Sequence, residues 1–584
     1  MLVLSIHHNS KNSNFIYLNM WKFSPKKSFM LYFAPDIFLI RFMMKRISLF
    51  LTALFFFTVS FCQTSSIREK KNGWHLLDQQ TDGYMGISLQ KAYDLLKGRK
   101  SSTVIVAVID SGIDTAQEDL RGILWRNEKE INGNGIDDDG NGYIDDIYGW
   151  NFDGAKNGEN LARNSYETAR VYHGWKKEFE GKKEKDIPEN KKFLYSQWLK
   201  ASDLINKDYD DAYKEQTGVS NYLVAAERSS LVLDNYLSTK EFTVNDIRPL
   251  AKNEKFQVAS SAEFWMDLFS RATGPTVKNT EVIRDISDYK SQLDAKINRK
   301  LQEPQDWRGE LVHDNYTDIN DRYYGNNNLK AGSGNHGTLV AGTIAAIRNN
   351  GIGMDGIADN VRIMAIRAVP GGDEHDKDVA LAIRYAADNG AKIINMSFGK
   401  PVSPYKQFVD DAVRYAASKG VLLVHGSGND GKDISKDVFY PNPVFINGEK
   451  ATNFITVGAS GDPSTGGLAA PFSNYSHDDV DIFAPGMNIY STASGNGYES
   501  ADGTSLACPV VTGVAALLKS YFPALTPRQI IVIIDSSGKR IDEDVALPGD
   551  EEKKVKFSSL SSSGRIINAY EAVKTALAME EKKK

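Results

Sequence analysis

The stretch GTSLACP (503–509), which continues directly into the apolar segment VVTGVAALL (510–518), determines how the rest of the chain must be organised. The apolar segment has hydrophobic residues on nearly every side, which is typical of a helix buried in a core. Because proline lacks the N–H that a helix interior needs, we expect Pro509 to lie in the first turn of that helix. Ser505 would then lie at a helix N-terminus, where free N–H groups and the positive dipole end favour negative charge.

A serine in this setting becomes an effective nucleophile only with help from other residues. Its hydroxyl needs a base, and the base needs a group that orients it. The stretch around Ser505 therefore predicts a histidine and an acidic partner elsewhere in the chain.

The composition is that of an ordinary globular protein. The 584 residues include 70 Lys and Arg against 75 Asp and Glu, and this length is enough for two or more domains. No basic excess indicates a nucleic-acid partner.

A secretory signal is predicted near the amino end. Lys45 and Arg46 precede a short apolar segment, 47–59, and the small residues Ser60 and Cys62 stand three positions and one position before Gln63. A positive region, a short apolar region and small residues before a cleavage point are the features of such a signal, and the apolar segment is short for a membrane span. We expect cleavage near Cys62–Gln63, and hence a secreted, periplasmic or cell-surface protein with no stable membrane span in the mature chain.

Met43 or Met44 would be a natural start for this signal, which makes residues 1–42 an over-long start. A lipid anchor on Cys62 is the alternative, but the bulky Phe61 argues against it. After cleavage only Cys508 would remain, so the sequence predicts no internal disulfide.

Strands and helices alternate along most of the chain. The run TVIVAVI (103–109) is apolar and β-branched, which is typical of a strand buried on both faces. The predicted helices are 89–96, 336–347, 379–388, 406–419 and 566–579, and the other predicted strands are 361–367, 392–396, 421–425, 454–457 and 480–483. This alternation predicts an α/β fold whose parallel sheet is covered by helices on both faces.

Residues 155–306 interrupt the alternation with a different texture. They are rich in Lys, Glu and Asp, and Trp175, Trp198 and Trp265 are scattered through helix-like sequence, with 222–237 the clearest amphipathic segment. We interpret the segment as a mainly helical insertion whose aromatic residues pack into a small core of its own. It is either a surface elaboration or a recognition module.

Three residues occupy positions suited to act with Ser505. Asp110 follows the strand 103–109, and a charge after so apolar a strand has to be paired. His336 lies among small residues in GSGNHGTLVAG (332–342), at the start of a predicted helix. Asn429 closes the loop GSGN (426–429), where its amide could donate to an oxyanion beside the Ser505 N–H. Taken singly, each is also a common turn or capping residue.

The three residues occur in the order Asp110, His336, Ser505, and this order excludes two known classes of serine hydrolase. A nucleophile elbow requires Gly-x-Ser-x-Gly and the order Ser, Asp, His, whereas the chymotrypsin type runs His, Asp, Ser on an all-β fold. His425 competes with His336 for the role of base, but the alternation of its strand directs it elsewhere.

With these motifs the sequence resembles the subtilisin-like serine peptidases (subtilases) over about residues 100–150 and 307–575. The segments VIDSG (108–112), NHGTLVAG (335–342) and GTSLACP (503–509) are similar to the family's Asp, His and Ser blocks. The resemblance implies a subtilisin-like α/β fold and a serine endopeptidase that acts on polypeptides through Asp110, His336, Ser505 and the oxyanion donor Asn429. It implies no cofactor for the chemistry.

The same resemblance extends to substrate binding. Ser397, Phe398 and Gly399, together with the loop that contains Gly428, match segments whose backbone flanks the P1 residue, which precedes the scissile bond. The first of these segments pairs with extended substrate as an added strand. Two departures from the family pattern, Leu506 and Cys508, conserve volume, and we expect Cys508 to be packed rather than reactive.

An acidic, Gly-rich loop, NGNGIDDDGNGYIDD (132–146), has the donor pattern of half a calcium loop. Asp137, Asp139 and Asn141 alternate as oxygen donors, and Asp145 follows shortly after. Subtilases often use calcium for stability, so the resemblance supports a structural calcium ion. The alternative is an acidic turn without an ion.

We therefore predict a secreted serine endopeptidase. A catalytically silent subtilase-like scaffold that binds partners through its insertion is one alternative, and an intramolecular processing protease or a transferase with the same acyl-enzyme is another. The predicted division is 1–62 for the signal with its over-long start, 63–154 for an N-terminal segment and the first part of the catalytic domain, 155–306 for the insertion, and 307–584 for the rest of the catalytic domain with a charged tail.

Overall fold

The computed structural model describes residues 71–271, 276–332, 334–463 and 467–582. The predicted signal and its cleavage point at Cys62–Gln63 lie outside the described residues. The described chain forms two compact units, one made of residues 71–205 and 303–582 and the other of residues 206–302.

The larger unit is built on a nine-stranded sheet with the strand order β10-β13-β7-β6-β5-β4-β1-β3-β2. All neighbouring strands are parallel except β10, which pairs antiparallel with β13 at one edge. The strands are β1 (Val104–Asp110), β2 (Gly149–Asn151), β3 (Val361–Arg367), β4 (Ile393–Met396), β5 (Leu422–Gly426), β6 (Phe454–Ser460), β7 (Ile482–Pro485), β10 (Lys539–Arg540) and β13 (Arg565–Ile566). Two separate hairpins are β8 (Ile489–Ala493) with β9 (Gly497–Ala501) and β11 (Asp544–Leu547) with β12 (Asp550–Lys556).

Strand β1 shows why the sheet is covered on both faces. Val106 and Val108 pack into one hydrophobic core, whereas Ala107 and Ile109 pack into another on the opposite face. All four side chains are fully buried. Because side chains alternate across a strand, a strand buried on both faces has to be apolar throughout, as this one is.

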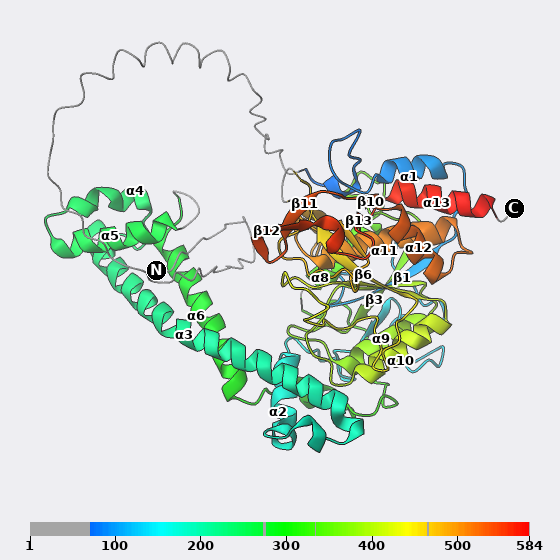
Figure 1. The fold of residues 1–584 in the computed structure, drawn as a ribbon, viewed down its shortest axis with the longest axis horizontal. Coiled ribbons are helices and arrows are strands. Elements are labelled where there is room, and N and C mark those ends of the chain that lie inside the picture. The colour runs from blue at the N-terminus through cyan, green and yellow to red at the C-terminus, as the bar shows by residue number, and fades with distance from the viewer. Residues whose placement is uncertain (1–70, 272–275, 333, 464–466, 583–584) are drawn as a thin grey trace, which may run out of the picture. The chain divides into compact units, whose positions relative to one another are not determined.

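Two layers of helices cover the sheet (Figure 1). One layer holds α8 and α11, with α1, α12 and α13 packed outside them, and the other holds α9 and α10. These helices are α1 (Leu89–Leu96), α8 (Asn335–Ala345), α9 (Asp376–Asp388), α10 (Lys406–Ser418), α11 (Thr504–Tyr521), α12 (Pro527–Ser537) and α13 (Ala569–Glu581). The predicted α/β fold with helices on both faces is confirmed.

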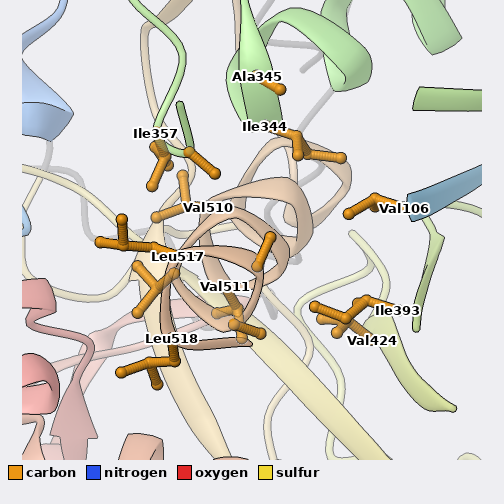
Figure 2. Packing of buried hydrophobic residues seen from close by; sticks show 14 of the residues in the cluster. Val106, Ile344, Ala345, Ile357, Ile393, Val424, Val510, Val511, Leu517 and Leu518 are labelled. Atoms are coloured by element: carbon orange, nitrogen blue, oxygen red, sulfur yellow. The ribbon is translucent and has the colours of Figure 1, made fainter. Parts of the chain in front are cut away.

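Helix α11 is the centre of the larger core (Figure 2), where Val510, Val511, Leu517 and Leu518 lie among side chains from the sheet and from α8. Of the described residues, α11 is the one helix long and apolar enough to cross a membrane, but 83% of it is buried inside the protein. It is therefore a core helix.

The expectation for Pro509 is wrong. Helix α11 begins at Thr504, so Pro509 lies inside the helix and beyond its first turn. A proline there leaves the carbonyl four residues earlier, that of Ser505, without its helical donor. The hydroxyl of Ser397 donates to this carbonyl at 2.8 Å instead. A side chain from the segment after β4 thus satisfies the acceptor that the proline leaves open.

The insertion between the Asp and His blocks is mainly helical, as predicted. Its helices are α2 (Glu167–Phe179), α3 (Lys192–Leu237), α4 (Val244–Ile247), α5 (Phe256–Ser270) and α6 (Asn279–Leu301), and α7 (Trp307–Val312) follows it. Short 3-10 helices are η1 (Trp74–Leu76), η2 (Glu184–Asp186), η3 (Glu189–Lys191), η4 (Arg248–Lys252) and η5 (Phe557–Ser559).

The aromatic residues of the insertion do not share one core, contrary to the prediction. Trp265 is fully buried at the centre of the unit 206–302. Trp198 belongs to a different cluster that includes Val402, a residue of the larger unit. The first part of the insertion is therefore packed as part of the larger unit, because its apolar side chains meet apolar residues there.

Candidate active site

The site lies at the carboxyl ends of three adjacent strands, β5, β4 and β1. Asp110 ends β1, Ser397 follows β4, and Asn429 follows β5. Parallel strands bring their carboxyl ends to one edge of the sheet, which is where such folds bind ligands. Asp110 lies 287 positions before Ser397 and 319 before Asn429 in the sequence, and strand pairing brings all three to this edge.

Helix α8 brings His336 against Asp110. The helix starts close to the loop after β1 because Gly337 has no side chain: a Cβ there would overlap the carbonyl oxygen of Gly112 and lie 3.1 Å from the Asp110 Cβ. His336 Nδ1 is 2.8 Å from one Asp110 carboxylate oxygen and 3.0 Å from the other. The carboxylate accepts a hydrogen bond from the Nδ1–H, so Nε2 is left as the acceptor of the neutral ring.

The two groups differ in exposure. The Asp110 side chain is 2% exposed, whereas that of His336 is 40% exposed. Burial by itself lowers the pKa of His336, but the charge of Asp110 and the hydrogen bond to it outweigh this effect and raise the pKa above its ordinary value of 6.5. Asp110 thus both orients the imidazole and favours its protonated form.

Ser505 lies in the first turn of α11, as predicted. The preceding Gly503 has φ +155°, and a Cβ there would lie 2.7 Å from the Ser505 Oγ, so a glycine leaves this hydroxyl uncovered. Ser505, His336 and Asn429 line one pocket of about 270 Å³. Within the described part of the chain, no hydrogen bond joins His336 to Ser505, and such contacts are often long before substrate binds.

The Asn429 amide is held in one orientation. Its Oδ1 accepts hydrogen bonds from the Thr504 backbone N–H at 2.8 Å and from the Thr504 hydroxyl at 3.0 Å. The Nδ2 group is thereby left to the pocket. The Cβ position of Gly503 lies 2.7 Å from the Ser505 Oγ and 3.7 Å from the Asn429 Nδ2, so the hydroxyl and the amide face the same small volume.

The two predicted substrate segments line this pocket. Ser397, Phe398 and Gly399 line it together with Gly428 and Asn429. Ser397 is also held by Asn395, whose amide donates to its hydroxyl at 2.9 Å. The hydrogen bond from Ser397 to the Ser505 carbonyl then ties this segment to the helix that carries the serine.

His425 and Cys508 are placed as the sequence predicted. Burial lowers the pKa of His425 to about 4, and its Nε2 lies 2.8 Å from the Phe398 carbonyl oxygen. The neutral ring therefore donates to the backbone behind the pocket. Cys508 is fully buried, and burial raises the pKa of its thiol to about 12, which makes it unreactive.

Some residues of the pocket were not identified from the sequence. Asp373, Glu374 and Phe439 all line it with Ser505 and His336. None of them belongs to a recognisable motif, and strand pairing brings them to the site from distant parts of the chain. Only a structure reveals residues of this kind.

The acidic loop gathers carboxylates, although not in the predicted set. Ligand oxygens of Glu130, Asp137 and Asp139 lie within 4.8 Å of one another. Glu130 was not identified from the sequence, because it precedes the motif. Its Oε1 also accepts hydrogen bonds from the backbone of Asp138 at 2.9 Å and Asp139 at 3.1 Å.

The other two predicted ligands have further roles in this loop. The Asp145 carboxylate accepts backbone hydrogen bonds from Gly133 at 2.7 Å and Gly135 at 2.9 Å. Asn141 donates from its amide to Asp146 at 3.0 Å, and its Oδ1 accepts from the Tyr143 N–H at 2.8 Å. These contacts fold the loop around the group of Glu130, Asp137 and Asp139.

One protein family matches most of the chain, and individual relatives match about a third of it. Residues 101–554 match the family described as "Subtilase family". A thermophilic serine proteinase of Bacillus sp. (strain AK1) is 43% identical over 187 residues, which are 32% of this chain and 43% of that protein. Alkaline elastase YaB of Bacillus sp. (strain YaB) is 40% identical over 207 residues, or 35% of this chain and 50% of that protein.

Another curated relative is a subtilisin and is also matched over about a third of this chain. Subtilisin Savinase of Lederbergia lenta is 38% identical over 196 residues, which are 33% of this chain and 66% of that protein. The chain thus spans about half the length of the curated relatives it matches. Among solved structures, a protease of Pseudoalteromonas arctica PAMC 21717 is 30% identical, with a TM-score of 0.32 over 43% of this chain and 74% of that one. A cold-adapted subtilisin-like serine proteinase is 28% identical, with a TM-score of 0.31 over 40% and 74% of the two chains.

The Asp110–His336 contact predicts the titration of His336. In the Ser505→Ala protein, NMR of the histidine rings should give a pKa for His336 above 6.5. In Asp110→Asn the pKa should be lower than in the Asp110 protein, because the charge and the hydrogen bond that favour the imidazolium are removed. The control is Asp478→Asn, which alters the exposed pair with His477 and should leave His336 unchanged. A His336 pKa at or below 6.5 in the parent would contradict this interpretation.

Proposed function

This chain belongs to the subtilase family, and from that premise we propose that it is a secreted serine endopeptidase that hydrolyses peptide bonds in polypeptides. The observation that carries the proposal is the Asp110–His336 hydrogen bond at the edge of a pocket that Ser505 also lines. Secretion rests on the predicted signal in residues 1–62, and the division of the chain into 63–154, 155–306 and 307–584 remains part of the proposal.

In the proposed reaction the Ser505 Oγ attacks the carbonyl carbon of the scissile bond while the Nε2 of His336 takes its proton. The tetrahedral intermediate collapses when His336 gives that proton to the leaving amine, and an ester remains on Ser505. Water, deprotonated by the same imidazole, then hydrolyses the ester. His336 acts as a base only when it is neutral, so its raised pKa restricts the reaction to pH values above that pKa.

Asp110 has the role of a buried orienting charge. Its carboxylate is nearly inaccessible to water, and the imidazolium that forms during the reaction is stabilised by it. The hydrogen bond from Nδ1 also keeps the tautomer whose Nε2 faces away from Asp110. This arrangement supports His336, rather than the buried His425, as the base.

Two donors are suited to stabilise the oxyanion of the intermediate. One is the Asn429 Nδ2. Thr504 donates two hydrogen bonds to the Oδ1 of the same amide, and this directs the Nδ2 into the pocket. The other is the Ser505 N–H, in the first turn of α11, where the helix has no internal acceptor for it. Removal of one donor of this kind typically lowers the rate about 100- to 1000-fold.

We also propose that the acidic loop binds a structural calcium ion. Glu130, Asp137 and Asp139 supply hard oxygen donors within 4.8 Å of one another. Lys129, the one cation paired with them in the described residues, lies 4.0 Å from Asp139 and is 77% exposed, so it offsets little of their charge. Calcium would hold this loop together, and the proposed reaction itself requires no metal.

Turnover of unfolded casein tests the proposed activity. The mature chain, residues 63–584, should cleave casein many times per molecule, because each deacylation regenerates Ser505. The Ser505→Ala protein should lose roughly 10⁶-fold in rate. The matched control is Ser435→Ala, an exposed serine outside this pocket. If the parent and Ser505→Ala are equally inert, the chain is a silent scaffold, and if the parent cleaves only its own chain it is a processing protease.

Thermal unfolding of the Ser505→Ala protein tests the calcium proposal without self-digestion. Calcium at about 100 times its dissociation constant should stabilise the fold by about 2.7 kcal/mol, and a chelator should remove this gain. Glu130→Gln should abolish the calcium-dependent rise in Tm because it removes one of the three gathered carboxylates. Glu128→Gln, at a side chain that is 81% exposed, is the control. If calcium still raises the Tm of Glu130→Gln, the ion binds at another site.

A further inference from the structure

Phe439 lies against both segments that line the proposed P1 site. A Cβ on Gly399 would overlap the Cε1 of the Phe439 ring and lie 2.7 Å from its Cζ. A Cβ on Gly428 would lie 3.2 Å from each of the same two atoms. One edge of the ring therefore lies beside both glycines, directly against Gly399 and next to Gly428, where the Asn474 Nδ2 is nearer still to the Cβ position.

The backbone holds the ring in this place. Tyr440, the next residue, exchanges two hydrogen bonds of 2.9 Å with Lys400, which follows Gly399. The segment of Phe439 is thus paired with the segment after β4. The ring also packs against the buried ring of His425, with centroids 6.0 Å apart.

Behind the ring there is already space. A cavity of about 360 Å³ lies on that side, lined by Ser427, Val438 and Phe445 among others. Of the described residues, Phe439 alone lines both this cavity and the pocket that contains Ser505 and His336. The ring is therefore the wall between the two, and the cavity is within the size range of small-ligand pockets.

We infer that Phe439 closes the floor of the P1 site, so that the enzyme cleaves after residues with small side chains, such as Gly, Ala or Ser. The inference rests on the proposed function, because it concerns the substrate of the same site. A P1 side chain that passes between Gly399 and Gly428 meets the edge of the ring. A large side chain would have to displace the ring or stay outside the site, and in either case it loses binding in the transition state.

The size of the effect follows from how hydrophobic pockets discriminate. One methylene that does not fit, or is missing, changes kcat/KM by about 10- to 200-fold. A benzyl side chain exceeds a methyl by more than one such group. Without the ring, the same side chain could enter the cavity and bury its apolar surface there.

The test compares peptide anilides that differ only in P1, with Ala, Leu or Phe at that position. Rates are normalised to the amount of Ser505 that an organophosphorus fluoride modifies, which counts working enzyme. The parent should prefer Ala over Phe by at least about tenfold in kcat/KM. In Phe439→Ala, kcat/KM for the peptide with Phe at P1, divided by kcat/KM for the peptide with Ala at P1, should rise by about 100-fold or more. Phe439→Leu should give an intermediate value of this ratio.

Val438→Ala is the matched control, since Val438 lines the cavity but not the pocket of Ser505. It should keep the P1 preference of the parent. A parent that cleaves after Phe or Leu as readily as after Ala overturns the inference even if neither Phe439 variant folds. An unchanged ratio in both variants also overturns it. A parent that cleaves none of the peptides and no casein instead contradicts the proposed function, and the inference falls with it.

Discussion

The hydrogen bond between Asp110 and His336 is the interaction on which the rest of the site depends. Asp110 ends a strand that is buried on both faces, so its charge is withdrawn from water and requires a partner. His336 supplies that partner from the start of α8, at a distance that Gly337 permits. The same contact raises the pKa of the imidazole and selects the tautomer whose Nε2 can accept a proton. One pair of side chains therefore both compensates the buried charge of Asp110 and sets the tautomer of His336.

The serine is positioned by the packing of the fold in a similar way. Pro509 removes a helical donor from the Ser505 carbonyl, and Ser397 replaces it, so that the segment beside the proposed P1 site is tied to the helix that carries Ser505. Asn395 extends this link, since it contacts both Ser397 and the Thr512 hydroxyl inside α11. The proposed substrate site and the core are therefore built from one connected set of polar contacts, and a change in either is expected to move the other.

Much of the architecture could be predicted because it is encoded locally. The apolar run 103–109 identifies a doubly buried strand, and the glycines around His336 and Ser505 identify the two helix starts. What could not be predicted depends on pairing between distant segments. Phe439 reaches Gly399 through the pairing of Lys400 with Tyr440, and Glu130 joins the acidic loop from outside its motif. Pro509 was misplaced because the donor that compensates for it, Ser397, lies more than a hundred residues away.

In the proposed reaction His336, held by Asp110, activates Ser505. The most direct measurement is the rate at which an organophosphorus fluoride, whose fluoride the serine oxygen displaces, modifies the chain, with the modified peptide identified by mass spectrometry. We expect one phosphoryl group per chain, on Ser505, and a rate that falls about 10⁴-fold in Asp110→Asn. No modification of Ser505, or an equal rate in both proteins, would contradict it.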